Sequence, residues 1–217
     1  MAALALDVWV DLVSPACYVA KHRLEVAVSA SAHPAEVTIT YRSLELDAHP
    51  PTDGSDTVAA QQARIHQVSE EAATAALEAL AVEARPDGVA IDVDALRPVR
   101  THDAHRLLAA SRAMGGPALQ GAVLERLFAA YFTEGKAIDD QAVLLRLGAE
   151  AGVDERRLAA ILASDDYEAE VAADQQAAAE RGITSVPFVL AGDQVASAGL
   201  QTVDGLARLL GLATGEI

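Results

Sequence analysis

DVWVDLVSPACYVAKHR, residues 7–23, changes from one local pattern to another at its centre. Its first half is a short, nearly continuous apolar run, which is typical of a strand buried on both faces. Ser14-Pro15 then predicts a helix start, because serine is a favoured N-cap and proline suits the first helical position. Cys17 therefore falls in the first helical turn, where free N–H groups and the helix dipole favour a thiolate or a bound anion.

The composition limits the class of protein. The chain has 217 residues, of which 52% are hydrophobic and 4% aromatic, so we expect one large, mainly helical unit or one domain with an insertion. A net charge of -16 and the absence of a basic run argue against nucleic-acid binding. No apolar run approaches the roughly 18 residues of a membrane span, and the N-terminus lacks the pattern of a signal peptide. A single cysteine excludes an internal disulfide and favours the cytoplasm.

Strand patterns lie near both ends of the chain, and helical patterns lie between them. We expect strands at 4–13 and 37–44, a helix at 15–31, and a hairpin around Gly192-Asp193. Residues 57–181 show helical patterns only, beginning with one helix over 58–84 whose apolar face carries Ile65, Val68 and Ala72. Later helices are expected to begin at the capping residues Asp103, Asp139, Asp154, Asp165 and Thr202, with Gly115-Gly116 as a break before Pro117.

The opening stretch resembles the reactive segment of the DsbA-type thioredoxin-fold oxidoreductases, above all their FrnE-like branch. That branch has D-x-x-C-P-W-C-Y-x-x-K-x-R-x-E here. The matching residues are Asp11, Pro15, Cys17, Tyr18, Lys21, Arg23 and Glu25. Two positions differ: Ser14 replaces the attacking cysteine, and Ala16 replaces the tryptophan.

Further segments resemble the same branch: YRSLELD at 41–47, DAHR at 103–106, LFAAYFTEG at 127–135 and GITSVPFV at 182–189. The resemblance thus covers nearly the whole chain. It implies an α/β thioredoxin-like fold with a large all-helical insertion, as in DsbA. Residues 1–50 and 183–217 would form the thioredoxin-like domain, and residues 51–182 the insertion.

The resemblance also implies site residues. The bond between Val186 and Pro187 is expected to be cis and to lie against the reactive turn, leaving backbone groups free to pair with an extended substrate. His105 is expected to face this turn from the insertion, or else to be an ordinary buried histidine. Gln201, at the start of the last helix, either meets the carboxylate of a thiol cofactor or belongs to a simple turn and cap. His102 and His105 lack a third ligand, so no metal site is expected.

Three functional hypotheses follow. A dithiol enzyme needs an attacking thiolate and a second thiol that resolves the mixed disulfide. Ser14 cannot attack sulfur, so the leading hypothesis is an FrnE/DsbA-like oxidoreductase homologue, without a required cofactor, that is weak or inactive in exchange with thiol or disulfide peptides. Within it, Cys17 either forms a single mixed disulfide or is a buried small hydrophobe in a vestigial site, with Ser14 a mere helix cap.

In the second hypothesis, Ser14 stabilises the thiolate of bound glutathione. The kappa-class glutathione transferases and the 2-hydroxychromene-2-carboxylate isomerases have a similar S-P-Y-S-type start. In the third, the protein is a non-catalytic binder that holds an extended peptide or small molecule between Pro187 and the insertion. The sequence leaves open the substrate, the binding of glutathione and whether the chain forms a homodimer.

Overall fold

The computed structural model describes residues 4–51, 54–193 and 195–215. Its sheet has the strand order β2-β1-β3-β4. The strands are β1 (Leu4–Val10), β2 (Val37–Ser43), β3 (Phe188–Ala191) and β4 (Val195–Ala198). β1 is parallel to β2 and antiparallel to β3, which forms the predicted hairpin with β4. The predicted α/β fold with helices between the second and third strands is confirmed.

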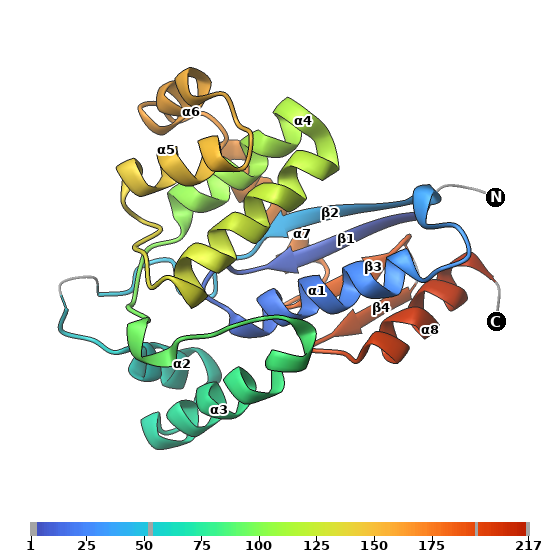
Figure 1. The fold of residues 1–217 in the computed structure, drawn as a ribbon, viewed down its shortest axis with the longest axis horizontal. Coiled ribbons are helices and arrows are strands. Elements are labelled where there is room, and N and C mark those ends of the chain that lie inside the picture. The colour runs from blue at the N-terminus through green and yellow to red at the C-terminus, as the bar shows by residue number, and fades with distance from the viewer. Residues whose placement is uncertain (1–3, 52–53, 194, 216–217) are drawn as a thin grey trace.

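The described residues form eight α-helices: α1 (Pro15–Ser29), α2 (Val58–His66), α3 (Glu70–Glu83), α4 (His102–Phe128), α5 (Gln141–Glu150), α6 (Glu155–Leu162), α7 (Glu168–Glu180) and α8 (Val203–Thr214). A π-helical turn, Ala129–Thr133, continues α4. α1 and α8 pack side by side on one face of the sheet, and α7 lies on the other (Figure 1). In the part of the chain described, no helix is long and apolar enough to cross a membrane.

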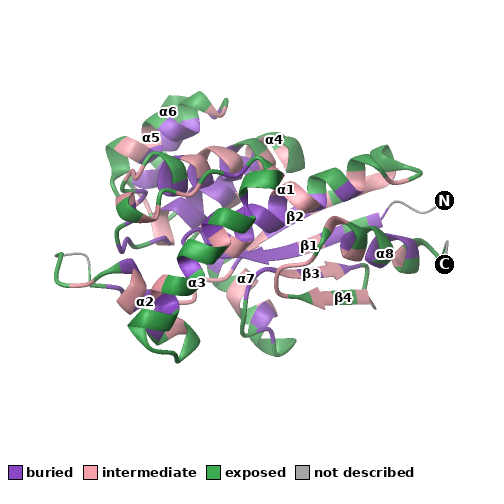
Figure 2. Ribbon diagram, turned by 60° about the horizontal axis from the view of Figure 1, so that its bottom comes forward, coloured by how far each residue is buried: buried purple, intermediate pink, exposed green. Residues whose placement is uncertain are grey.

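The last three residues of the central strand β1, residues 8–10, are buried on both faces, as the apolar run predicts, whereas Ala5 near its start is exposed (Figure 2). One continuous hydrophobic core joins the sheet to the inserted helices. α7 belongs to this arrangement although the expected boundary at residue 182 places it in the insertion. The Trp9 indole Nε1–H donates to the Asp174 carbonyl of α7 at 3.1 Å.

The helix expected over 58–84 is two helices. Gln67 adopts a left-handed conformation with φ 55° and ends α2, and the Ser69 side chain then accepts the Ala72 N–H and begins α3. The expected apolar face is therefore wrong, and Val68 is 48% exposed. α3 instead buries Ala73, Leu77 and Ala81.

Three helix starts also differ from the expected caps, whereas Asp154 and Thr202 cap as predicted. α4 begins after Thr101, α5 after Asp140, and α7 after Tyr167, whose left-handed φ of 68° delays the helix beyond Asp165. The break at Gly115-Gly116 is confirmed: Gly116, with φ 70° and ψ -164°, kinks α4 before Pro117.

The kink brings Gln120 to the outer edge of β2. The Gln120 side chain is buried; its Oε1 accepts the Tyr41 N–H at 3.0 Å, and its Nε2 donates to the Tyr41 carbonyl at 2.9 Å. Beside it, Asp174 Oδ2 accepts the Ser43 N–H at 3.0 Å. Side chains therefore replace a neighbouring strand along the C-terminal half of β2.

We predict that Gln120→Ala lowers the free energy of unfolding by about 2 kcal/mol, because it leaves two buried backbone groups of Tyr41 unpaired. Urea denaturation followed by circular dichroism measures this change. Gln176→Ala, which removes an exposed amide bound only to Glu180, is the matched control and should stay within about 0.5 kcal/mol of wild type. Equal stability of the two variants would contradict the role of Gln120.

Candidate functional site

The turn after β1 is closed by backbone hydrogen bonds. The Ser14 N–H donates to the Asp11 carbonyl at 3.2 Å, and the Cys17 N–H donates to the Ser14 carbonyl at 3.0 Å. Ser14 occupies the N-cap position of α1, but its side chain makes no capping hydrogen bond. Its hydroxyl lies near the Cys17 thiol and acts to lower the pKa of that thiol. The Ser14 side chain therefore does not cap α1.

Cys17 is fully buried. Burial raises the pKa of its thiol to about 12, although hydrogen bonds from the Ser14 side chain and the Asp11 backbone act in the opposite direction. The nearby Asp11 charge raises this pKa further. The thiol is therefore protonated at neutral pH, and the thiolate expected from its place in the first helical turn is not favoured. Desolvation outweighs the helix dipole here.

A buried carboxylate lies beside this turn. Asp11 Oδ2 accepts the Leu46 N–H at 2.8 Å, and Oδ1 accepts the Val13 N–H at 3.4 Å. His105 Nε2, from the first turns of α4, lies 3.7 Å from Asp11 Oδ1. His105 is fully buried, and neither ring nitrogen has a hydrogen-bond partner among the described residues. The insertion thus brings an imidazole to Asp11, next to the Ser14–Cys17 turn.

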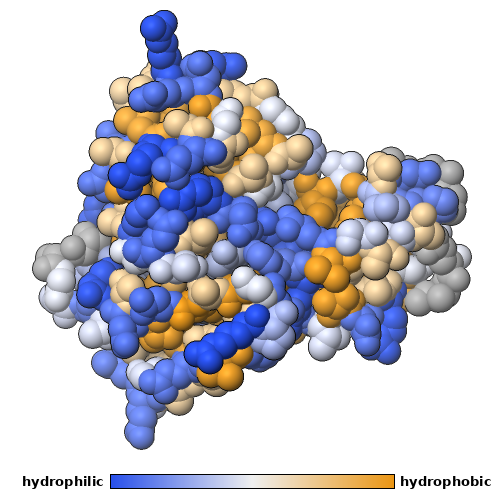
Figure 3. Space-filling view, in the orientation of Figure 1, coloured by the Kyte–Doolittle hydropathy of each residue, from blue (hydrophilic) through white to orange (hydrophobic). Residues whose placement is uncertain are grey.

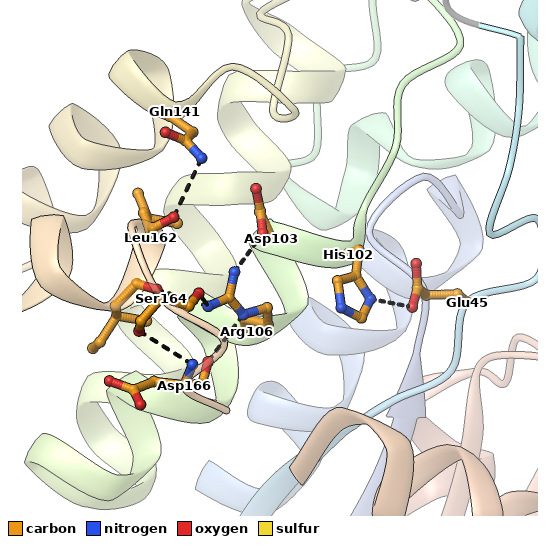
Figure 4. Close-up of polar contacts among 9 residues, drawn as sticks. Glu45, His102, Asp103, Arg106, Gln141, Leu162, Ser164 and Asp166 are labelled. Carbon is orange, nitrogen blue, oxygen red and sulfur yellow. Dashed lines mark hydrogen bonds and ion pairs between the residues drawn. The ribbon is translucent and has the colours of Figure 1, made fainter. Parts of the chain in front are cut away.

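Two contacts on either side fix the start of α4, and both appear in Figure 4. The buried Glu45 carboxylate, just after β2, accepts from His102 Nδ1 at 3.0 Å and from Gln175 Nε2 at 3.2 Å. The Arg106 guanidinium donates to Asp103, to the carbonyl of Ile161 in the last turn of α6, and to the carbonyls of Ser164 and Asp166 in the loop before α7. His105, between these anchors, is held in place.

A cavity of about 310 Å³ opens beside the same helix start. Its lining residues are Arg100, His102, Asp103 and Asp139. Within the described part of the chain, no group of three or more histidine, cysteine and acidic residues is arranged to hold a metal ion.

The Val186–Pro187 peptide bond is cis. The register pairs Trp9 of β1 with Phe188 of β3, so Pro187 lies where β1 ends, at Val10. The Pro187 carbonyl accepts the Gly199 N–H at 2.8 Å. The turn that carries Ser14 and Cys17 and the proline thus both lie at the end of the sheet where β1 finishes.

Gln201 is engaged elsewhere. Its Nε2 donates to the carbonyls of Ala198 at 2.9 Å and Gly199 at 3.4 Å, within its own loop. Its backbone carbonyl accepts from Arg23 Nη1 at 3.1 Å and ties the loop to α1. Of the two expected roles of Gln201, these contacts therefore fit the turn and helix cap better than the contact with the carboxylate of a thiol cofactor.

Sequence reasoning assigned no site role to Asp11 or Glu45. Asp11 directly follows β1 and Glu45 lies two residues after β2, at the end of the sheet where the site lies. This position could have been recognised in the sequence, because the C-terminal ends of neighbouring parallel strands lie close together in the sheet. Their burial, however, depends on α4, which lies far along the chain.

Comparisons with known proteins agree with this geometry. Residues 5–211 match the model of the DSBA-like thioredoxin domain. The structure is similar to that of a probable DsbA oxidoreductase from Streptomyces coelicolor, with 30% identity, a TM-score of 0.86 and coverage of 99% of this chain and 91% of that one. No curated protein matches the chain.

Two more distant structures share the fold. Cytosolic disulfide reductase DsbM from Pseudomonas aeruginosa has 21% identity, a TM-score of 0.64 and coverage of 98% of this chain and 96% of that one. A 2-hydroxychromene-2-carboxylate isomerase has 23% identity, a TM-score of 0.66 and coverage of 98% and 95%. The match of residues 5–211 to the family model and the 30% identity to the Streptomyces coelicolor protein show that the chain belongs to the DSBA-like thioredoxin domain family.

Proposed function

We propose that this protein is a thiol-redox protein of the FrnE-like branch that is weak or inactive in dithiol exchange. The observation that supports this most is the state of Cys17, the one cysteine of the chain, which is buried with a pKa of about 12. Exchange requires a thiolate that attacks and a second thiol that resolves. The Ser14 hydroxyl supplies neither.

The surrounding edge retains the parts needed to receive an extended thiol or disulfide peptide. The cis Val186–Pro187 bond lies at the end of β1, beside the turn that carries Ser14. We therefore propose such a peptide as the partner. We also propose the cytoplasm as its compartment, by analogy with DsbM, which is described as cytosolic.

We predict that Ser14→Cys raises the rate of insulin reduction in the presence of dithiothreitol above that of wild type, since it restores the attacking thiol next to Cys17. Turbidity of precipitating insulin measures the rate. Ser14→Ala is the matched control and should remain at the wild-type level, as should Ser14→Cys combined with Cys17→Ala. An inert Ser14→Cys variant that is folded would mean that the rest of the site no longer supports exchange.

The state of Cys17 gives a second prediction. At pH 8, a thiol with a pKa of about 12 is ionised roughly a thousandfold less than one at its ordinary value of 9.0. We expect iodoacetamide to alkylate Cys17 in the native protein at least a hundredfold more slowly than in urea, and oxidised glutathione to leave no adduct. Mass spectrometry measures both. Rapid modification of the native protein would support the single mixed disulfide instead.

Glutathione chemistry is the second candidate function. The Ser14 hydroxyl makes no helix-capping bond and acts to lower the pKa of the nearby Cys17 thiol, which is the effect that a bound thiolate would need. Two structures with the same fold belong to a 2-hydroxychromene-2-carboxylate isomerase and to DsbM with GSH. In this alternative, Ser14 donates its hydroxyl hydrogen to the glutathione sulfur.

If glutathione binds, ligand at about 100 times its dissociation constant stabilises the native state by roughly 2.7 kcal/mol, and the melting temperature rises. We expect Ser14→Ala to reduce the shift, because the thiolate loses its donor. S-methylglutathione, which has no ionisable thiol, is the control ligand and should give a smaller shift. No change with reduced glutathione at millimolar concentration would exclude this candidate.

A further inference from the structure

The outer edge of β2 is open at Ile39, whereas the Val37 N–H before it donates to the Pro34 carbonyl. Residues of a strand alternate between those whose backbone N–H and C=O face the neighbouring strand and those whose groups face away. Tyr41 and Ser43 face away from β1, and the side chains of Gln120 and Asp174 bind them. By the same alternation, Ile39 also faces away. Within the described residues, no side chain closes the edge at Ile39.

A groove of about 580 Å³ lies along this open part of the edge. Its walls are α1, the N-terminal half of β2 and the part of α4 after the kink, where the small residues Ala118, Gly121 and Ala122 leave room for another chain. Figure 1 shows α1, β2 and the later half of α4, which form these walls, and Figure 3 shows apolar surface on the same face of the molecule.

The floor of the groove contains an unsatisfied polar group. The Tyr41 side chain lines the groove and is almost fully buried, and its hydroxyl has no hydrogen-bond partner in the described structure. The charges of Glu25 and Glu125, which line the same groove, act on this hydroxyl. Buried polar groups are nearly always paired, so a hydroxyl left alone beside an open groove points to a ligand that is absent here.

The charge of the groove selects the ligand. Lys21 Nζ lies 2.9 Å from Glu25 Oε1 and 2.8 Å from Glu125 Oε2. Glu125 also pairs with His22 Nε2 at 3.1 Å, so Glu25, which shares Lys21, is the carboxylate of the groove with the least compensation. The Glu25 side chain is 45% exposed and has no other ion-pair partner among the described residues. The whole chain carries a net charge of -16, which favours a basic partner and disfavours a second copy of the same chain.

We propose that an extended peptide segment with a lysine or arginine side chain binds in this groove as an added strand on β2. Its backbone pairs with the outward N–H and C=O of Ile39, and its basic side chain lies beside Glu25. The site is separate from the reactive turn, since Ile39 pairs with Leu6 near the start of β1, whereas the turn follows the end of β1 at Val10. The proposed peptide binding therefore does not depend on the proposed redox chemistry.

The test uses a fluorescein-labelled, acetylated heptapeptide of sequence TVKVKVT and fluorescence anisotropy at low salt. We expect saturable binding of one peptide per chain. Two control peptides should bind at least tenfold more weakly. In TVEVEVT glutamates replace the lysines, and in a TVKVKVT peptide with N-methylated valines the backbone cannot form the strand pairing. Equal binding of the N-methylated peptide would show attraction to the acidic surface only and would overturn the proposal.

Variants locate the site. Ala118→Trp fills the groove from an exposed position and should weaken binding at least tenfold; Ala122→Trp repeats the test if that variant fails to fold. Glu25→Gln should weaken binding about threefold, the range of an exposed ion pair, whereas Glu78→Gln on the exposed side of α3 should have no effect. Unchanged binding to both tryptophan variants, no saturable binding, or a wild-type dimer in sedimentation that Ala118→Trp dissociates would overturn the proposal.

Discussion

The Asp11 carboxylate is the contact on which the arrangement of the site depends. It lies at the end of the central strand, where its two oxygens accept backbone N–H groups from the turn after β1 and from the segment after β2. The same carboxylate faces His105 of α4. One buried anion thus joins two neighbouring strands and the insertion at the edge where the reactive turn lies. Removing an acceptor from such a place leaves donors unpaired, which is costly in a dry environment.

The chemistry of the turn follows from burial more than from position. A thiol at the head of a helix is ordinarily acidified, and the local sequence pattern predicts this for Cys17. The core packed around it reverses the effect, because a charged sulfur would lose its hydration without gaining a cation. The family scaffold is therefore intact around a sulfur atom that is poorly suited to attack. For this chain, membership of the family therefore does not by itself imply activity in dithiol exchange.

The sequence predicted the parts of the fold that depend on local patterns. The apolar run of β1, the helix after Ser14-Pro15, the break at Gly116 and the hairpin at Gly192 all involve residues whose backbone preferences act within a few positions. It failed where a single residue departs from its usual conformation. Gln67 and Tyr167 adopt positive φ without being glycine, and each displaced a helix boundary.

The site was predictable in outline only. Resemblance placed Ser14, Cys17, His105 and Pro187 in one neighbourhood, and this stays a prediction. In the structure Ser14 and Cys17 share the turn after β1, and His105 lies 3.7 Å from Asp11 of that turn. The burial of Cys17, the unpaired ring of His105 and the loop contacts of Gln201 depend on packing between distant segments, which no local pattern encodes.

The closure of β2 by side chains also affects how the protein is made. The groups that bind Tyr41 and Ser43 lie 79 and 131 residues further along the chain. During synthesis, β1 and β2 leave the ribosome well before Gln120 and Asp174 exist, so the nascent pair has a bare edge of backbone donors and acceptors for that interval. Bare edges of this kind recruit other strands. The growing chain is therefore more exposed to aggregation than the finished protein until Gln120 and Asp174 have been made and have reached β2.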